Sequence, residues 1–232
     1  MTNLIHLGQL VALGMALMLP LANPLTSMTL LLALGGRLSH QERQRQIKQA
    51  AFYVVGIMLV TYYAGTWIMQ TFGISVPGLR IAGGLIVASI GFSMLFPSTS
   101  VDDIPEAEAI SEHLARKKPA NIAFVPLALP GTAGPGTIAM IISGTASVSP
   151  AMLSTYAPWV MQLAAIIVFV LLGLLFWVVL RFSGRIVKVL GHGGVEAVSR
   201  IMGFLLVCMA VQFVINGVLE IVNGMMVMPG GA

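Results

Sequence analysis

Residues 20–27 read Pro-Leu-Ala-Asn-Pro-Leu-Thr-Ser and interrupt an uncharged, apolar segment that extends from Leu4 to Leu34. As one helix this segment would be about 46 Å long, which exceeds the roughly 30 Å of a bilayer's hydrocarbon core. Proline removes a backbone donor and clashes with the preceding turn. Pro20 and Pro24 therefore predict a break between two half-helices.

A second stretch repeats this pattern. Residues 126–133 read Pro-Leu-Ala-Leu-Pro-Gly-Thr-Ala and match residues 20–27 at five of eight positions. Interrupted backbone is tolerated in a membrane where it is buried in protein or lines a water-filled cavity. Two such breaks, one in each half of a chain, are the pattern that points to the binding site of a transporter.

The composition indicates an integral membrane protein, because 57% of the 232 residues are hydrophobic and only 9% are charged. The net charge of +4 does not indicate nucleic-acid binding, since the basic residues lie between apolar spans. The single cysteine, Cys208, excludes an internal disulfide.

The apolar pattern predicts an all-α fold with six transmembrane helices, of which the first and the fourth are broken. The second span covers about 50–70, the third follows Arg80 and stops at Phe96, and the fifth begins near Trp159. The sixth covers about 201–222. We expect a capping box at Ser39 and Glu42, and a short surface helix over 106–118.

The distribution of basic residues predicts the orientation. With six crossings, the loops expected at 37–48, 97–120 and 181–200 share one side, and they hold eleven of the twelve Lys and Arg residues. Only Arg80 lies on the other side. The positive-inside rule then places these loops in the cytoplasm and both termini outside, in the periplasm of a bacterium.

Internal similarity suggests how the two halves are related. Residues 80–87, Arg-Ile-Ala-Gly-Gly-Leu-Ile-Val, resemble residues 200–207, Arg-Ile-Met-Gly-Phe-Leu-Leu-Val. Because each half has three spans, the second half enters the membrane from the opposite side. The prediction is an inverted 3+3 repeat, with a first repeat at 1–96, a cytoplasmic linker at 97–120 and a second repeat at 121–232.

Several of these strings resemble the MarC family of bacterial inner-membrane proteins. They are residues 19–26, 72–84, 121–128, 134–140 and 199–209. The resemblance covers nearly the whole chain, implies a multi-pass location in the inner membrane, and names no substrate. More distantly the chain is similar to the LysE exporter superfamily, whose six-span members export amino acids and other small solutes.

The half-helices that begin near Pro24 and Pro135 would direct free amide donors and positive dipole ends toward the middle of the membrane, where they attract anions. The residues expected to bind substrate are Pro20, Asn23, Pro24, Thr26, Ser27, Pro126, Pro130, Gly131, Thr132, Gly134, Pro135, Gly136 and Thr137. The glycines would let a ligand approach the backbone closely. The alternative is that the prolines only kink packed helices, with the hydroxyls bonded to the preceding turn.

Charged residues at the membrane edges suggest gates. Arg80 with Glu220 would form an outer latch, and Glu196 with Arg200 an inner one. The alternative is that these side chains only extend toward the aqueous interface. Polar residues within the fifth and sixth spans are expected to form interhelical hydrogen bonds; they include Gln162, Gln212 and Asn216.

These patterns favour a secondary transporter that exports a small zwitterionic or anionic metabolite such as an amino acid. The alternatives are a channel or facilitator, and a membrane protein that transports nothing. We expect no enzyme, cofactor or metal site, because no His, Asp or Glu cluster lies in the spans and no nucleotide-binding loop is present. The expected partners are the solute and the bilayer. The substrate, the coupling ion, the direction of transport and a homo-oligomeric state stay open.

Overall fold

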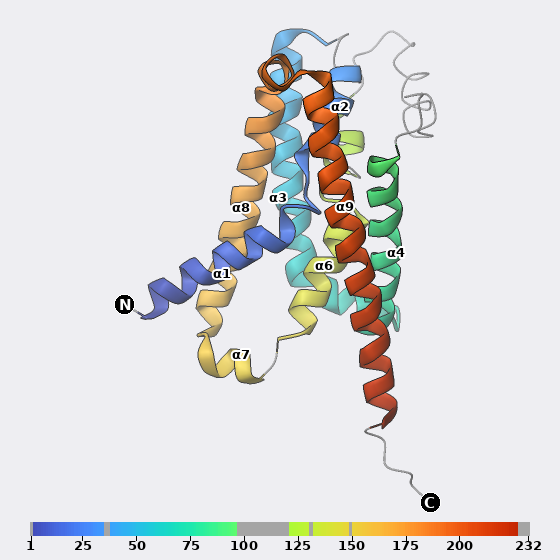
Figure 1. Ribbon diagram of the computed structural model, residues 1–232. Helices are drawn as coiled ribbons and strands as arrows, with labels where there is room; N and C mark the ends of the chain where they lie inside the picture. The colour runs from blue at the N-terminus through green and yellow to red at the C-terminus, as the bar shows by residue number, and fades with distance from the viewer. Residues whose placement is uncertain (1, 35–37, 97–120, 130–131, 149, 227–232) are drawn as a thin grey trace, which may run out of the picture.

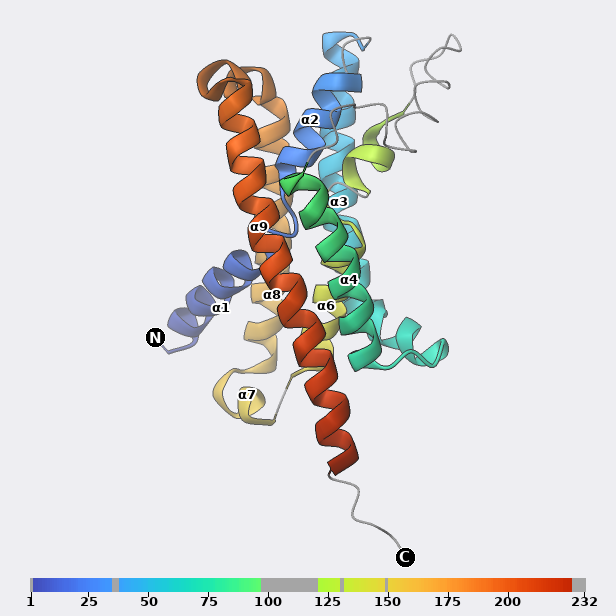
Figure 2. The same ribbon diagram turned by 45° about the vertical axis from the view of Figure 1, so that its right-hand side comes forward.

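A computed structural model of the chain describes residues 2–34, 38–96, 121–129, 132–148 and 150–226, and every regular element within these ranges is a helix. The long helices stand side by side in a bundle, and the first helix is tilted away from the others (Figure 1). Figure 2 shows the same arrangement from a second side, with the C-terminal end of the last helix extending beyond the bundle.

The predicted break in the first apolar segment is confirmed. Helix α1 covers Thr2–Met18 and helix α2 covers Pro24–Leu34. The residues between them form a turn, with the amide of Ala22 donating to the carbonyl of Met18 at 2.8 Å. Proline at the first helical position loses no hydrogen bond and has a helical φ already fixed, which explains why α2 begins at Pro24.

Helix α3 covers His40–Thr71, and α4 covers Val76–Leu95. The predicted N-cap at Ser39 is confirmed, since its hydroxyl accepts a hydrogen bond from the Glu42 amide at 3.2 Å. The Glu42 carboxylate accepts from Nε2 of Gln46 at 3.3 Å, and the return bond that would complete a capping box stays a prediction. The segment 37–48, expected to connect two spans, is helical from His40 onward, as the cap at Ser39 predicts. This segment is rich in Gln, Arg, Glu and Lys, which are good helix formers, and it continues directly into the span.

The predicted break in the fourth span is also confirmed. A single π-helical turn, η3, covers Ala123–Ala128, and α6 covers Pro135–Ala146. The short helix α7, Pro150–Thr155, was not predicted. Helix α8 covers Pro158–Arg181 and begins next to Trp159, as expected.

The glycine-rich segment 181–200, expected as a loop, is mostly helical. Helix α9 covers Ser183–Met226 and changes direction at Gly191, where φ is 68°. Only glycine adopts this region without a steric penalty. The change of direction is therefore confined to Gly191, and the chain is helical both before and after this residue.

Helices α4 and α9 run in opposite directions and pack closely (Figure 1). A Cβ added to Gly91 would lie 2.8 Å from the carbonyl oxygen of Gly203, and one added to Gly84 would lie 2.8 Å from that of Ala210. Gly84 and Gly91 therefore let the two helix backbones approach each other closely. Helix α4 contains the Arg-Ile-x-Gly string at 80–87, and α9 contains the one at 200–207.

In the described part of the chain, four helical segments are long and apolar enough to cross a membrane, and α1 and α6 are shorter apolar helices. The four segments are α3, α4, α8 and residues 193–224 of α9. The count of six spans and the inverted repeat stay predictions. The linker at 97–120, including the helix expected at 106–118, lies outside the described residues.

Candidate functional site

The two proline breaks contact each other inside the bundle. The hydroxyl of Ser27, in the first turn of α2, donates to the carbonyl of Leu127 in η3 at 2.9 Å and lies 3.2 Å from the hydroxyl of Thr132. Ser27 and Thr132 are both fully buried. Residues about one hundred positions apart in the sequence thus form one polar contact, which we call the central contact.

Asn23 caps the start of α2. Its Oδ1 accepts a hydrogen bond from the amide of Leu25 at 3.0 Å, as an N-cap residue does. This bond fixes which end of the side-chain amide is the oxygen. The Nδ2 group is buried and has no hydrogen-bond partner among the described residues, and the side chain is only 6% exposed. An amide nitrogen carries two donors, so an unpaired one in the interior is unusual.

Helix α6 begins without a side-chain cap. Gly134 precedes it in an extended conformation, and no side chain accepts from its first amides. The hydroxyl of Thr137 donates to the carbonyl of Thr132 at 2.9 Å and holds the turn before the helix. Because α2 and α6 both begin near the middle of the bundle (Figure 1), the positive ends of their dipoles lie in the same region.

The other residues of the predicted site differ in their surroundings. Pro20, Pro24 and Pro126 are buried, Thr26 is half-buried and Pro135 is exposed. Pro130 and Gly131 lie outside the described residues.

Gly136 has a packing role in this conformation. A Cβ added there would lie 2.4 Å from Cγ2 of Val87 on α4 and 3.7 Å from a methyl group of Leu21. The space expected for a ligand beside Gly136 is therefore occupied by apolar side chains.

Two cavities lie away from the central contact. One, of about 250 Å³, has an almost entirely apolar lining from α1, α3, α6, α7 and α8, and it reaches Met18 at the end of α1. The other, of about 450 Å³, lies where α3 begins and α8 ends. Neither is lined by a residue of the turn at 19–23, by Leu129 or by residues 132–134.

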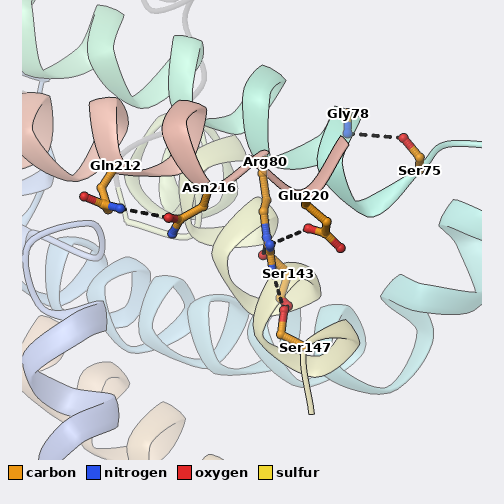
Figure 3. Close-up of polar contacts among 8 residues, drawn as sticks. All are labelled: Ser75, Gly78, Arg80, Ser143, Ser147, Gln212, Asn216 and Glu220. Carbon is orange, nitrogen blue, oxygen red and sulfur yellow. Dashed lines mark hydrogen bonds and ion pairs between the residues drawn. The ribbon is translucent and has the colours of Figure 1, made fainter. Parts of the chain in front are cut away.

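Arg80 and Glu220, the predicted outer pair, are in contact (Figure 3). One guanidinium nitrogen of Arg80 lies 2.5 Å from Oε2 of Glu220, and Nε donates to the hydroxyl of Ser143 at 2.6 Å. A third nitrogen donates to the hydroxyl of Ser147. Arg80 thereby joins α4, α9 and α6, and we call this set the Arg80 cluster. The Arg80 side chain is 17% exposed.

The other predicted pair does not fit an inner gate. Glu196 and Arg200 are 2.5 Å apart, but both lie on α9, one turn from each other, and both are exposed. A latch must join two elements that move apart, and this pair joins neighbouring turns of one helix. The interhelical bonds expected of Gln212 and Asn216 are also wrong, because these exposed residues bond to each other at 2.8 Å along α9 (Figure 3).

The sequence analysis did not predict three residues that form these polar contacts. Ser143 on α6 and Ser147, the C-cap residue of that helix, are four residues apart, a spacing that places both on one helix face. The third is Gln46, whose Oε1 accepts from the amide of Ile122 at 3.0 Å while the side chain is 1% exposed. It joins the start of the second half to α3, and no local pattern signals this long-range contact.

Within the described residues, no group of three or more His, Cys, Asp or Glu side chains is placed to hold a metal ion. The groups at the central contact are hydroxyls and a backbone carbonyl, and Asn23 at the start of the same helix, α2, adds a side-chain amide. Such groups can bind a small polar or anionic ligand through hydrogen bonds and through the positive dipole ends of α2 and α6.

Comparisons with protein families and with individual proteins both match the chain to MarC proteins. A family described as MarC family integral membrane protein matches residues 8–222. The chain is 56% identical over 220 residues to the UPF0056 inner membrane protein MarC of Escherichia coli strain K12 and to that of Shigella flexneri. The match covers 95% of this chain and 99% of each relative. No solved structure matches the chain.

Proposed function

The chain belongs to the MarC family of integral membrane proteins, and we propose that it is a secondary carrier that exports a small zwitterionic or anionic metabolite such as an amino acid. The word "inner membrane" in the relatives' name supports a multi-pass location in a bacterial inner membrane. The observation that carries the proposal is the central contact between two interrupted helices.

The chemistry of this contact suits a carboxylate or another small anion. The starts of α2 and α6 supply backbone donors with positive dipole ends, and Nδ2 of Asn23 is a further donor with no partner in the described residues. None of these groups carries a full charge. A neutral site avoids the cost of a permanently charged side chain in the membrane interior. The empty site therefore leaves no unpaired charge buried after the solute has dissociated.

The order of elements supports alternating access. Each half begins with an interrupted helix and ends with a helix that contains an Arg-Ile-x-Gly string, and these two helices, α4 and α9, pack antiparallel. An inverted repeat of this kind lets one half rock against the other around a fixed site. In the conformation described here the two breaks touch each other, so binding requires them to separate.

The proposal is tested by thermal unfolding of the purified protein with amino acids, small organic acids and inorganic anions. We expect one of these classes to raise the Tm of the wild-type protein. Asn23→Leu should abolish this ligand-induced shift, measured from the variant's own Tm without ligand, because it removes the buried donor. Asn216→Leu is the matched control, since Asn216 is an exposed asparagine on α9. An equal shift in both variants would exclude Asn23 from the site.

Transport by a carrier is then separated from the alternatives in proteoliposomes. A carrier shows saturable uptake of the stabilising solute and exchanges it against solute trapped inside. A channel or facilitator shows flux that does not saturate in the same concentration range. Binding without any flux would indicate a membrane protein that does not transport.

A further inference from the structure

The 450 Å³ cavity lies at the end of the bundle where α3 begins, α8 ends and α9 begins. This is the end predicted to face the cytoplasm. Five of its nine lining residues are basic: His40, Arg43, Arg181, Arg185 and Lys188. None of the lining residues is a carboxylate, so the cavity concentrates positive charge.

Neutral groups hold two of the arginines in place. Arg43 donates to the hydroxyl of Ser183 at 2.9 Å, and Arg181 donates to Oε1 of Gln44 at 2.5 Å. The guanidinium of Arg181 also lies over the ring of Trp177, 5.5 Å from its centroid. Ser183 is only 1% exposed, so the bond from Arg43 ends at a fixed, buried oxygen.

Carboxylates in the described part of the chain are engaged elsewhere. The ion pairs there are Arg80 with Glu220 and Arg200 with Glu196, and neither pair lines the cavity. Glu42, on the same turn of α3 as Arg43, accepts from Nε2 of Gln46 at 3.3 Å. Cations at this density repel one another, and an anion between them would relieve the repulsion.

The first part of α9, residues 183–190, crosses the end of the bundle instead of continuing along it (Figures 1 and 2). Its basic side chains, Arg185 and Lys188, line the cavity, while the neighbouring Val189 and Leu190 are 85% and 46% exposed. Basic residues beside exposed apolar ones are typical of a helix that lies in the membrane interface. The cavity is therefore placed at the level of lipid head groups.

We propose that this cavity binds a phosphate group, carried either by the head group of an anionic phospholipid or by free inorganic phosphate. Arginine matches phosphate geometry with paired donors, and three arginines line the cavity. Basic pockets between helices on the cytoplasmic side are suited to anionic head groups. The site is independent of the proposed carrier function, because it lies at the end of the bundle and shares no residue with the central contact.

The test uses the full chain in a maltoside detergent, which contains no phosphate. Phosphatidylglycerol is titrated in one arm, sodium phosphate in the second and sodium chloride at matched ionic strength in the third, with Tm as the readout. Arg185→Gln with Lys188→Gln removes two lining charges from exposed positions. Arg45→Gln with Lys48→Gln is the control, because it removes two exposed charges from α3 outside the cavity lining.

We expect stabilisation by phosphatidylglycerol or by phosphate but not by chloride, with the same midpoint for the wild type and the control. The cavity variant should need about thirtyfold more ligand, because each basic group near such a surface contributes about 1 kcal/mol. A response to phosphatidylglycerol alone assigns the site to a lipid head group, and a response to phosphate assigns it to the free ion. Equal midpoints in the two variants, an equal effect of chloride, or no stabilisation would overturn the proposal. If the double variant does not fold, Lys188→Gln alone replaces it in the same titration, because this substitution removes no described hydrogen bond.

Discussion

The central contact and the Arg80 cluster lie near opposite ends of the same helix, α6, and they use different chemistry. Near the start of α6, buried hydroxyls bond to each other and to backbone carbonyls, with no charge involved. Near its end, Ser143 and Ser147 bond to a guanidinium that also holds a carboxylate. One helix thus connects a neutral polar centre to a charged cluster at the edge of the bundle.

The difference follows from the cost of burying charge. A charge in the membrane interior is expensive, whereas at the edge a long side chain reaches water. The exposure follows the same trend, since Ser27 is 0% exposed while the side chain of Glu220 is 44% exposed. We therefore expect stability to depend on close packing at the centre and on charge at the edge.

The largest effect is expected from Gly136→Ala near the central contact. The new methyl group would meet Val87, so unfolding in detergent should require about 1–3 kcal/mol less free energy. Val87→Ala in the same chain should restore part of this loss. Gly144→Ala is the matched control on α6, since a Cβ there meets nothing within 4 Å. Equal losses at both glycines would show that packing at the centre is not tight.

A smaller effect is expected at the Arg80 cluster. Arg80→Glu places two carboxylates together and should lower the free energy of unfolding by about 1–2 kcal/mol, part of it from the lost bonds to Ser143 and Ser147. Glu220→Arg in the same chain should recover about 0.5–1 kcal/mol of this loss. The coupling should weaken as salt is added. Additive effects of the two substitutions would mean that the pair contributes nothing to stability.

The smallest effect is expected at Glu196 and Arg200, where both side chains are exposed and one helical turn apart. Glu196→Gln should lower the free energy of unfolding by about 0.3–0.5 kcal/mol. The measurement is the same unfolding experiment at low and high salt. A loss as large as that at Arg80 would contradict the distinction between a cluster that joins three helices and a pair within one.

Local signals predicted much of the fold. The helix starts at Pro24 and Pro135 and the N-cap at Ser39 each depend on a few neighbouring residues, and each was confirmed. The segment 181–200 was misjudged because several glycines there resembled a loop. Within α9 only Gly191 leaves the helical conformation, since packing and helix propensity override isolated glycines.

The site was predicted less completely, because its contacts join distant parts of the chain. The repeated proline motif indicated that two breaks correspond, but it could not show that Ser27 meets Leu127 and Thr132. The contact between Arg80 and Glu220 was predicted from their expected depth in the membrane. The serines of α6 that complete the cluster were missed, since nothing in their sequence context distinguishes them from other helical serines.

The hydrogen bond between Gln46 and Ile122 has a consequence for biogenesis. These residues are 76 positions apart, and the ribosome delivers α3 long before it delivers η3. The acceptor that the second half needs on arrival is therefore already in the bilayer. The amide of Ile122 thus meets an acceptor that is synthesised before it, and no later segment has to supply one.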